Sequence, residues 1–190
     1  MKKNYHLKTV LVIFLCQFLV IIAYAQINQP VIAYLTIQGK RTGVFKGSGG
    51  KPANKDKIEC IGFRYGVSAP HDMTSGLPTG KRVHEPIVII KNIDASSPQL
   101  LQAIYSNETL TSVLIEFFKK SPNGQSFTWY TIKLTNATIA RISQYGGLGS
   151  PEKLIPNSIP EEEISLTFQK IDFENTEAKT SASDSWGAVQ

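Results

Sequence analysis

The chain has few cysteines and few histidines, and this scarcity excludes several classes of protein. Among 190 residues there are two cysteines and three histidines. Cys16 lies within an apolar N-terminal run, which leaves Cys60 as the one cysteine of the remaining chain. A scaffold held together by intramolecular disulfides is therefore excluded, and we expect Cys60 to be a buried residue of a strand.

Sequence motifs for catalysis and for metal binding are also missing. A zinc site needs three or four ligands, and His71 and His84 stand in no C-x-x-C or H-E-x-x-H spacing. No G-x-S-x-G nucleophile motif occurs. The glycine-rich run 39–51 lacks the spacing of a phosphate-binding loop, because Phe45 stands where the first glycine belongs and Pro52 follows the lysine. We expect no catalytic residues, no cofactor and no metal.

Most of the net positive charge of the chain comes from its first 25 residues. The formal net charge is +5, and three of the 20 basic residues, but none of the 15 acidic ones, precede residue 26. The rest of the chain carries +2, with its basic residues dispersed except around Lys81 and Arg82. This balance is not typical of a nucleic-acid-binding protein.

The first 25 residues have the pattern of a secretory signal peptide. Lys2, Lys3 and Lys8 precede the apolar run 10–22, and the small-residue site 23–25 reads Ala-Tyr-Ala. The apolar run is too short to span a bilayer comfortably, so we expect no stable membrane anchor. We predict cleavage after Ala25 and a secreted or periplasmic protein.

Alternating apolar residues predict a mainly β domain. The predicted strands are Val31–Ile37, Ile58–Val67, Pro86–Ile90, Val113–Phe118, Phe127–Leu134, Ala137–Ile142 and Ile164–Phe173. The Ser-Pro-Asn-Gly sequence at 121–124 predicts a hairpin turn. The apolar parity of the last strand changes near Lys170, which predicts a bulge or a bend there. We interpret the acidic run 161–163 as a solvated edge that could also meet Lys81 and Arg82 of a neighbour.

The segment 80–104 joins a basic loop, a buried strand and a helix within one short run. Pro86 opens the apolar strand, where its missing N–H is not needed. Ser97 followed by Pro98 predicts an N-cap and a first helical residue, with Leu100, Leu101 and Ile104 on one face.

This segment, KRVHEPIVIIKNIDASSP, resembles the central run of the haemolysin co-regulated protein (Hcp) family, the tube component of type VI secretion. AYLTIQG at 33–39 resembles the opening strand of that family, and EISLTFQKIDF at 163–173 resembles its closing strand. Asp184-Ser185-Trp186 is similar to the tail of some members. The resemblance covers residues 33–173.

The resemblance implies an antiparallel β-barrel of two sheets with one short α-helix, over residues 26–175, followed by a polar tail at 176–190. It also implies that the irregular stretch 68–83 is an arm that reaches toward neighbouring subunits. The candidate subunit or ring interface residues are His71, Asp72, Lys81, Arg82 and His84.

The implied function is structural and non-enzymatic. Hexameric rings would stack into a tube and carry or export effector cargo, with spike and sheath components of the secretion apparatus as partners. The alternative, which the signal peptide favours, is an exported monomeric binding module that uses the same barrel.

Overall fold

The computed structural model describes residues 31–50, 54–146, 148–150, 153–154 and 159–186. The chain divides into two units, 1–30 and 31–190, and the described residues all belong to the second unit. The predicted signal peptide, with its cleavage after Ala25, lies outside the described residues.

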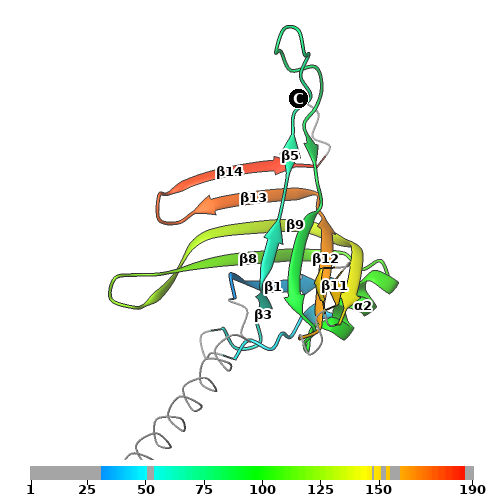
Figure 1. Ribbon diagram of the computed structural model, residues 1–190, viewed down its shortest axis with the longest axis vertical. Helices are drawn as coiled ribbons and strands as arrows, with labels where there is room; N and C mark the ends of the chain where they lie inside the picture. Colours follow the sequence, from blue (N-terminus) through cyan, green and yellow to red (C-terminus); the bar gives the residue numbers. More distant parts are fainter. Residues whose placement is uncertain (1–30, 51–53, 147, 151–152, 155–158, 187–190) are drawn as a thin grey trace, which may run out of the picture. The chain divides into compact units, whose positions relative to one another are not determined.

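The described residues form a mainly β structure with one short helix, as predicted (Figure 1). The helix is α2 (Ser97–Tyr105). The strands are β1 (Ala33–Gly39), β2 (Gly43–Val44), β3 (Ile58–Cys60), β4 (Gly62–Arg64), β5 (Val67–Ser68), β6 (Val83–His84), β7 (Ile87–Asn92), β8 (Leu110–Lys120), β9 (Ser126–Tyr145), β10 (Leu148–Ser150), β11 (Lys153–Leu154), β12 (Glu161–Thr167), β13 (Lys170–Asn175) and β14 (Thr180–Ser185).

The long strand β9 connects the two halves of the sheet. Its first half pairs with β8 and β13, and its second half pairs with β12. We predicted two separate strands here, but the chain continues through Asn136, whose φ of 49° bends the strand without ending it. Asparagine tolerates the left-handed region better than most residues, so one strand can serve both halves.

The segment predicted as a single strand at 58–67 is divided. β3 pairs with β1, and β4, which begins two residues after Cys60, pairs with β7. The hydrogen-bonded order of the described strands is β2-β1-β8-β9-β12-β7-β4, and it does not close on itself. The continuous segment that contains β3 and β4 connects β1, near one end of this order, with β7, near the other end. The backbone N–H of Ile61 donates to Ile90 O at the change of partner.

The predicted bend near Lys170 is confirmed. β12 ends at Thr167 and β13 begins at Lys170, so the strand predicted at 164–173 becomes two. Phe168 and Gln169 lie at the bend, and Gln169 N donates to Thr135 O. The change of parity in the sequence therefore marks the place where the chain moves from pairing with the second half of β9 to pairing with its first half.

The sheet extends beyond the boundary predicted at residue 175. Residues 180–185, which we predicted as part of a polar tail, form β14 and pair with β13 in antiparallel register. This segment has no buried apolar residue, which is why alternation in the sequence did not indicate a strand.

The core lies between the two halves of the sheet and beneath α2. It contains apolar side chains from the central strands, from the helix and from Phe45 in the loop after β2. Cys60 is fully buried in β3, as predicted. The backbone of this loop lies close to the residues before β3, since Gly47 N donates to Asp56 O at 2.8 Å. A side chain at Gly47 would collide with Lys57 O.

The acidic run at 161–163 is not a solvated edge, and that prediction was wrong. Glu162 is fully buried, and Lys91 Nζ donates to its Oε1 at 2.8 Å. Gln144 Nε2 donates to the other oxygen at 2.7 Å. Alternation along β12 places Glu162 on the same face as Ile164, so the middle glutamate points inward.

The predicted N-cap was displaced by one residue. Helix α2 begins at Ser97, with Ser96 as its N-cap and Pro98 as its second residue. The Ser97 hydroxyl donates to Glu162 at 2.7 Å and accepts from Asp94 N at 3.0 Å. Ser97 therefore ties the start of the helix to β12 and does not cap a free helical N–H.

Candidate assembly surface at the arm and the C-terminal strand

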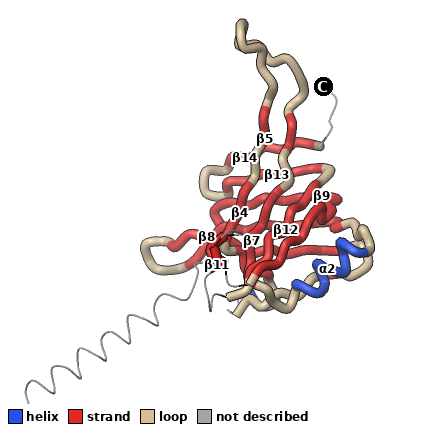
Figure 2. Tube along the Cα trace, turned by 45° about the vertical axis from the view of Figure 1, so that its right-hand side comes forward, coloured by secondary structure: helices blue, strands red, loops and turns tan. Residues whose placement is uncertain are grey.

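An arm formed by residues 67–84 extends from the sheet beside β14 (Figures 1 and 2). β5 and β6 form its root, with Val67 paired to His84 and Ser68 paired to Val83. The hydrogen bonds of residues 69–81, within the described structure, all stay inside that segment. The outer part of the arm therefore depends on its root for its direction.

The tip of the arm is a turn organised by Asp72. Its Oδ1 accepts hydrogen bonds from Thr74 N at 3.1 Å and from Ser75 N and Oγ at 2.7 and 2.9 Å. These donors, with Ser75 N the strongest, lower the pKa of Asp72. The turn presents two apolar side chains to solvent, since Met73 is 98% exposed and Leu77 is 65% exposed.

The five residues predicted as an interface are divided between the tip and the root of the arm. His71, paired with Pro78 across the arm, and Lys81 are exposed, while Asp72 holds the tip turn. Arg82 and His84, in contrast, turn toward the C-terminal strand of their own chain.

Arg82 and Asp184 form a two-pronged ion pair at the root. Nε and Nη2 of Arg82 each donate to one oxygen of Asp184. This pair, above all the arginine hydrogen bond, lowers the pKa of Asp184 to about 2. Two parallel donors fix the orientation of both side chains more strongly than a single contact would.

His84 is buried between aromatic rings and polar partners. Its Nδ1 lies 2.7 Å from the Tyr65 hydroxyl. Its Nε2 lies 3.2 Å from Asp184 Oδ2, within ion-pair distance when the ring is protonated, but the angle does not make a hydrogen bond. The ring centroid of Trp186 lies 5.7 Å from that of His84, and the edge of Phe168 meets Trp186 at 5.1 Å.

We call Tyr65, Arg82, His84, Asp184 and Trp186 the root cluster. Arg82 and His84 were predicted as interface residues of the arm, and Asp184 and Trp186 were noted for their similarity to the tail of some Hcp proteins. Nothing in the sequence indicated Tyr65. Arg82 and Asp184 are 102 positions apart in the sequence, so no local pattern connects them. The one available indication was an acid close to a tryptophan at the end of a polar segment.

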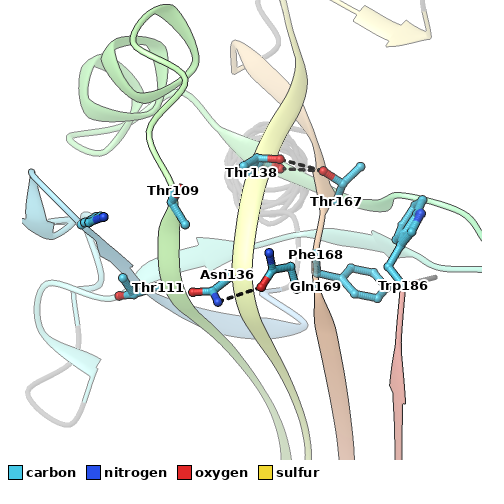
Figure 3. Close-up of a pocket in the computed structure, with 9 residues that line it drawn as sticks. Thr109, Thr111, Asn136, Thr138, Thr167, Phe168, Gln169 and Trp186 are labelled. Carbon is cyan, nitrogen blue, oxygen red and sulfur yellow. Dashed lines mark hydrogen bonds between the residues drawn. The ribbon is translucent and has the colours of Figure 1, made fainter. Parts of the chain in front are cut away.

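A cavity of about 760 Å³ lies beside the root cluster, at the bend of the sheet (Figure 3). Asn136 Nδ2 donates to Gln169 Oε1 at 2.9 Å, and the hydroxyls of Thr138 and Thr167 lie 2.8 Å apart. Lys40 is the one charged residue among those that line the cavity. Small-molecule sites are usually enclosed and mostly apolar. This cavity is open, and its polar side chains already form hydrogen bonds with one another, so it does not have the character of such a site.

The described residues offer little for catalysis. They contain no group of three or more His, Cys, Asp or Glu side chains placed to hold a metal ion. Burial raises the pKa of Cys60 to about 11, which disfavours the thiolate that a nucleophile requires. In the same residues, no helix has the length and apolar character needed to cross a bilayer.

Comparison with known proteins places the fold and the sequence in one family. The family model described as "Type VI secretion system effector, Hcp" matches residues 34–174. The "Major exported protein" of Pseudomonas aeruginosa is 34% identical over 164 residues, which cover 81% of this chain and 94% of that protein.

Solved structures agree with the sequence comparison. A crystal structure of an Hcp protein has a TM-score of 0.72 and 28% identity, over 81% of this chain and 98% of that one. The secreted protein Hcp3 from Pseudomonas aeruginosa has a TM-score of 0.67 and 29% identity, over 84% of this chain and all of that one. The chain therefore belongs to the Hcp family, and it is a non-enzymatic, structural tube protein of the type VI secretion system.

Proposed function

We propose that this chain assembles into hexameric rings, that the rings stack through the arm, and that the resulting tube carries or exports effector proteins. The observation that carries the proposal is the exposed apolar tip of the arm, Met73 and Leu77. Apolar side chains on a projecting segment are typical of a surface that is covered in an assembly.

The root of the arm adds a second exposed apolar pair. Val67 is 53% exposed and Val83 is 56% exposed, on the paired strands β5 and β6. A neighbouring subunit that packed along the arm would cover apolar surface at both ends, and His71 and Lys81 would supply polar contacts between them. We add Val67 and Val83 to the candidate subunit or ring interface. The interface residues predicted from the sequence remain part of the proposal, namely His71, Asp72, Lys81, Arg82 and His84. Arg82 and His84 would act through the root of the arm, because both face Asp184 of their own chain.

A ring would form if one surface of each subunit bound a different surface of the next subunit. Head-to-tail contacts of this kind close into a ring when the rotation between copies divides a full turn. The arm would also meet a different surface on another copy, but that contact would join one ring to the next. Effector cargo would then lie in the channel, and spike and sheath components of the apparatus would bind the ends and the outside of the tube.

Export is part of the proposal. The sequence of residues 1–25 has the order of a signal peptide, and a relative is a major exported protein. N-terminal sequencing of the protein recovered from outside the cytoplasm should begin at Gln26. An N-terminus that still carries residues 1–25 would contradict cleavage.

Size-exclusion chromatography with light scattering on residues 26–190 tests the ring. We expect the mass of six chains, with no loss of mass on moderate dilution. A single-chain mass over a wide concentration range would contradict assembly.

The single-chain result would favour a second candidate, an exported monomeric binding module on the same fold. The observation in its favour is the predicted signal peptide, which a tube assembled in the cytoplasm does not need.

A further inference from the structure

The arm is held from two sides at its root. On one side, the chain continues directly from β4 into β5 and from β6 into β7, and Glu85 N donates to Gly66 O. On the other side, the end of β14 reaches the arm through Asp184 and Trp186. The arm is therefore connected to the sheet through its own neighbouring strands, and it is also contacted by residues from the C-terminal end of the described chain.

Chain continuity alone leaves the direction of the arm weakly determined. β5 and β6 are strands of two residues each, and they pair with each other and with no other described strand. A short isolated two-stranded ribbon is marginally stable in water. A further constraint is needed to give the arm one orientation.

The contacts of Asp184 supply that constraint. Both oxygens of Asp184 accept hydrogen bonds from Arg82, the residue before β6. Asp184 Oδ2 also lies 3.2 Å from Nε2 of His84, the last residue of β6. The side chain of Asp184 is 19% exposed, which limits the screening of these interactions by solvent.

Trp186 adds packing to this charge contact. Its ring lies against His84, and the Phe168 side chain points toward it from the bend between β12 and β13 (Figure 3). The tryptophan therefore joins three elements, namely the arm, the bend and the end of β14. An edge-to-face aromatic pair has a preferred geometry, which fixes position as well as adding stability.

We propose that Asp184 and Trp186 form a latch that sets the direction of the arm, and so control how readily one ring docks on the next. The effect on docking rests on the proposed function, whereas the effect on the arm itself does not. Asp184 and Trp186 are positioning residues, because they contact the root of the arm and not its exposed tip.

Distances between spin labels test the latch directly. One label is attached at Met73→Cys on the arm tip and one at Lys120→Cys at the exposed end of β8. Cys60 is buried and its pKa is raised, so it remains unlabelled. Dilution of doubly labelled chains into excess unlabelled protein restricts the measurement to pairs within one chain, whether or not rings form.

We expect one narrow distance distribution in the parent protein and a clearly broader one in Asp184→Asn. Amide exchange of His84 and Glu85 should also become faster by about tenfold in that variant. Asp184→Glu keeps the carboxylate, so its distance distribution should be nearly as narrow as in the parent protein. A general loss of packing would instead broaden the distribution in both variants.

Asp172→Asn is the matched control, because Asp172 pairs with Lys170 on the neighbouring strand β13. It should leave both measurements unchanged. Trp186→Ala provides a second test of the latch if Asp184→Asn does not fold.

A distribution in Asp184→Asn or Trp186→Ala that is as narrow as in the parent would overturn the latch. Equal broadening in Asp172→Asn would overturn it as well. A single-chain mass in solution, in contrast, would contradict ring assembly and leave this measurement valid.

Discussion

At the scale of single residues, Lys91 and Glu162 form an ion pair inside the described fold. Both side chains are almost fully buried, and Lys91 Nζ also donates to Asp94 Oδ1 and to Asn92 O, each at 2.7 Å. Each charge is therefore surrounded by partners that replace water. The pair connects β7 to β12 directly beneath the start of α2.

Replacing Glu162 by glutamine should destabilise the fold strongly. The variant removes the fully buried counter-charge of the Lys91 ammonium and leaves Asp94 as its remaining carboxylate partner. We expect the free energy of unfolding to fall by about 3 kcal/mol. Urea denaturation followed by circular dichroism measures this loss.

The combined variant Lys91→Met with Glu162→Leu should be far less destabilised, because it removes both charges from the interior. Lys119→Ala is the control, since Lys119 and Glu177 form an exposed pair expected to contribute under about 1 kcal/mol. A Glu162→Gln protein as stable as the parent would show that the pair does not hold β7 to β12.

The ionisation of Asp184 gives a second prediction at the residue scale. Its pKa of about 2 lies below the ordinary value of 3.8 for an aspartate, because Arg82 stabilises the carboxylate. A lowered pKa in the folded state means that the ion pair contributes stability above pH 3.8, and that this contribution is lost as the pH falls toward 2.

Carbon-detected NMR titration of the Asp184 carboxylate should therefore show a midpoint near 2. In Arg82→Ala the midpoint should move up toward the ordinary range. A midpoint near 3.8 in the parent protein would mean that the two side chains are not paired in solution.

At the scale of elements, the sequence predicted which segments are strands better than it predicted what they pair with. Alternation located the core-facing strands, and the parity change near Lys170 located the bend between β12 and β13. Parity is a local property of the chain, so it can be read from one sequence. The partners of β3 and β4 could not be read in this way, because pairing is decided by distant segments.

Polar strands and buried charges were the other failures of prediction at this scale. β14 has the sequence TSASDS, which lacks the apolar residues that indicate a strand, and it is ordered by pairing with β13. Glu162 looked like a member of a solvated acidic run, because its partner Lys91 lies 71 residues earlier in the chain. Both errors arise where tertiary contacts outweigh local composition.

The arm shows the same limit at the candidate site. Its glycine, proline and polar content predicted an irregular segment, and the family resemblance implied an arm there. The structure has a projecting arm. The division into an exposed tip and a root held by Asp184 was not predictable, since the root cluster joins residues from three separate segments of the chain.

At the scale of the whole molecule, the exposed tip of the arm leads to a prediction about assembly. Replacing Met73 and Leu77 together by glutamate should weaken association between rings, because a charge at a desolvated apolar contact is costly. Both side chains are exposed in the single chain, so the melting temperature should stay within about 2 °C of the parent value. Analytical ultracentrifugation measures the association.

Ser121→Glu with Gln125→Glu is the control, because these residues lie at the exposed hairpin between β8 and β9. The control adds the same charge at a different projection and should leave association unchanged. Equal association by the arm variant and the parent would remove the arm from the interface.

The ring itself is the central claim, and electron microscopy of the purified chain 26–190 tests it most directly. The proposed assembly predicts class averages with six-fold symmetry and an open channel, and stacks of such rings at high protein concentration. Averages that show only separate single-chain particles, at concentrations where light scattering is also measured, would contradict the claim.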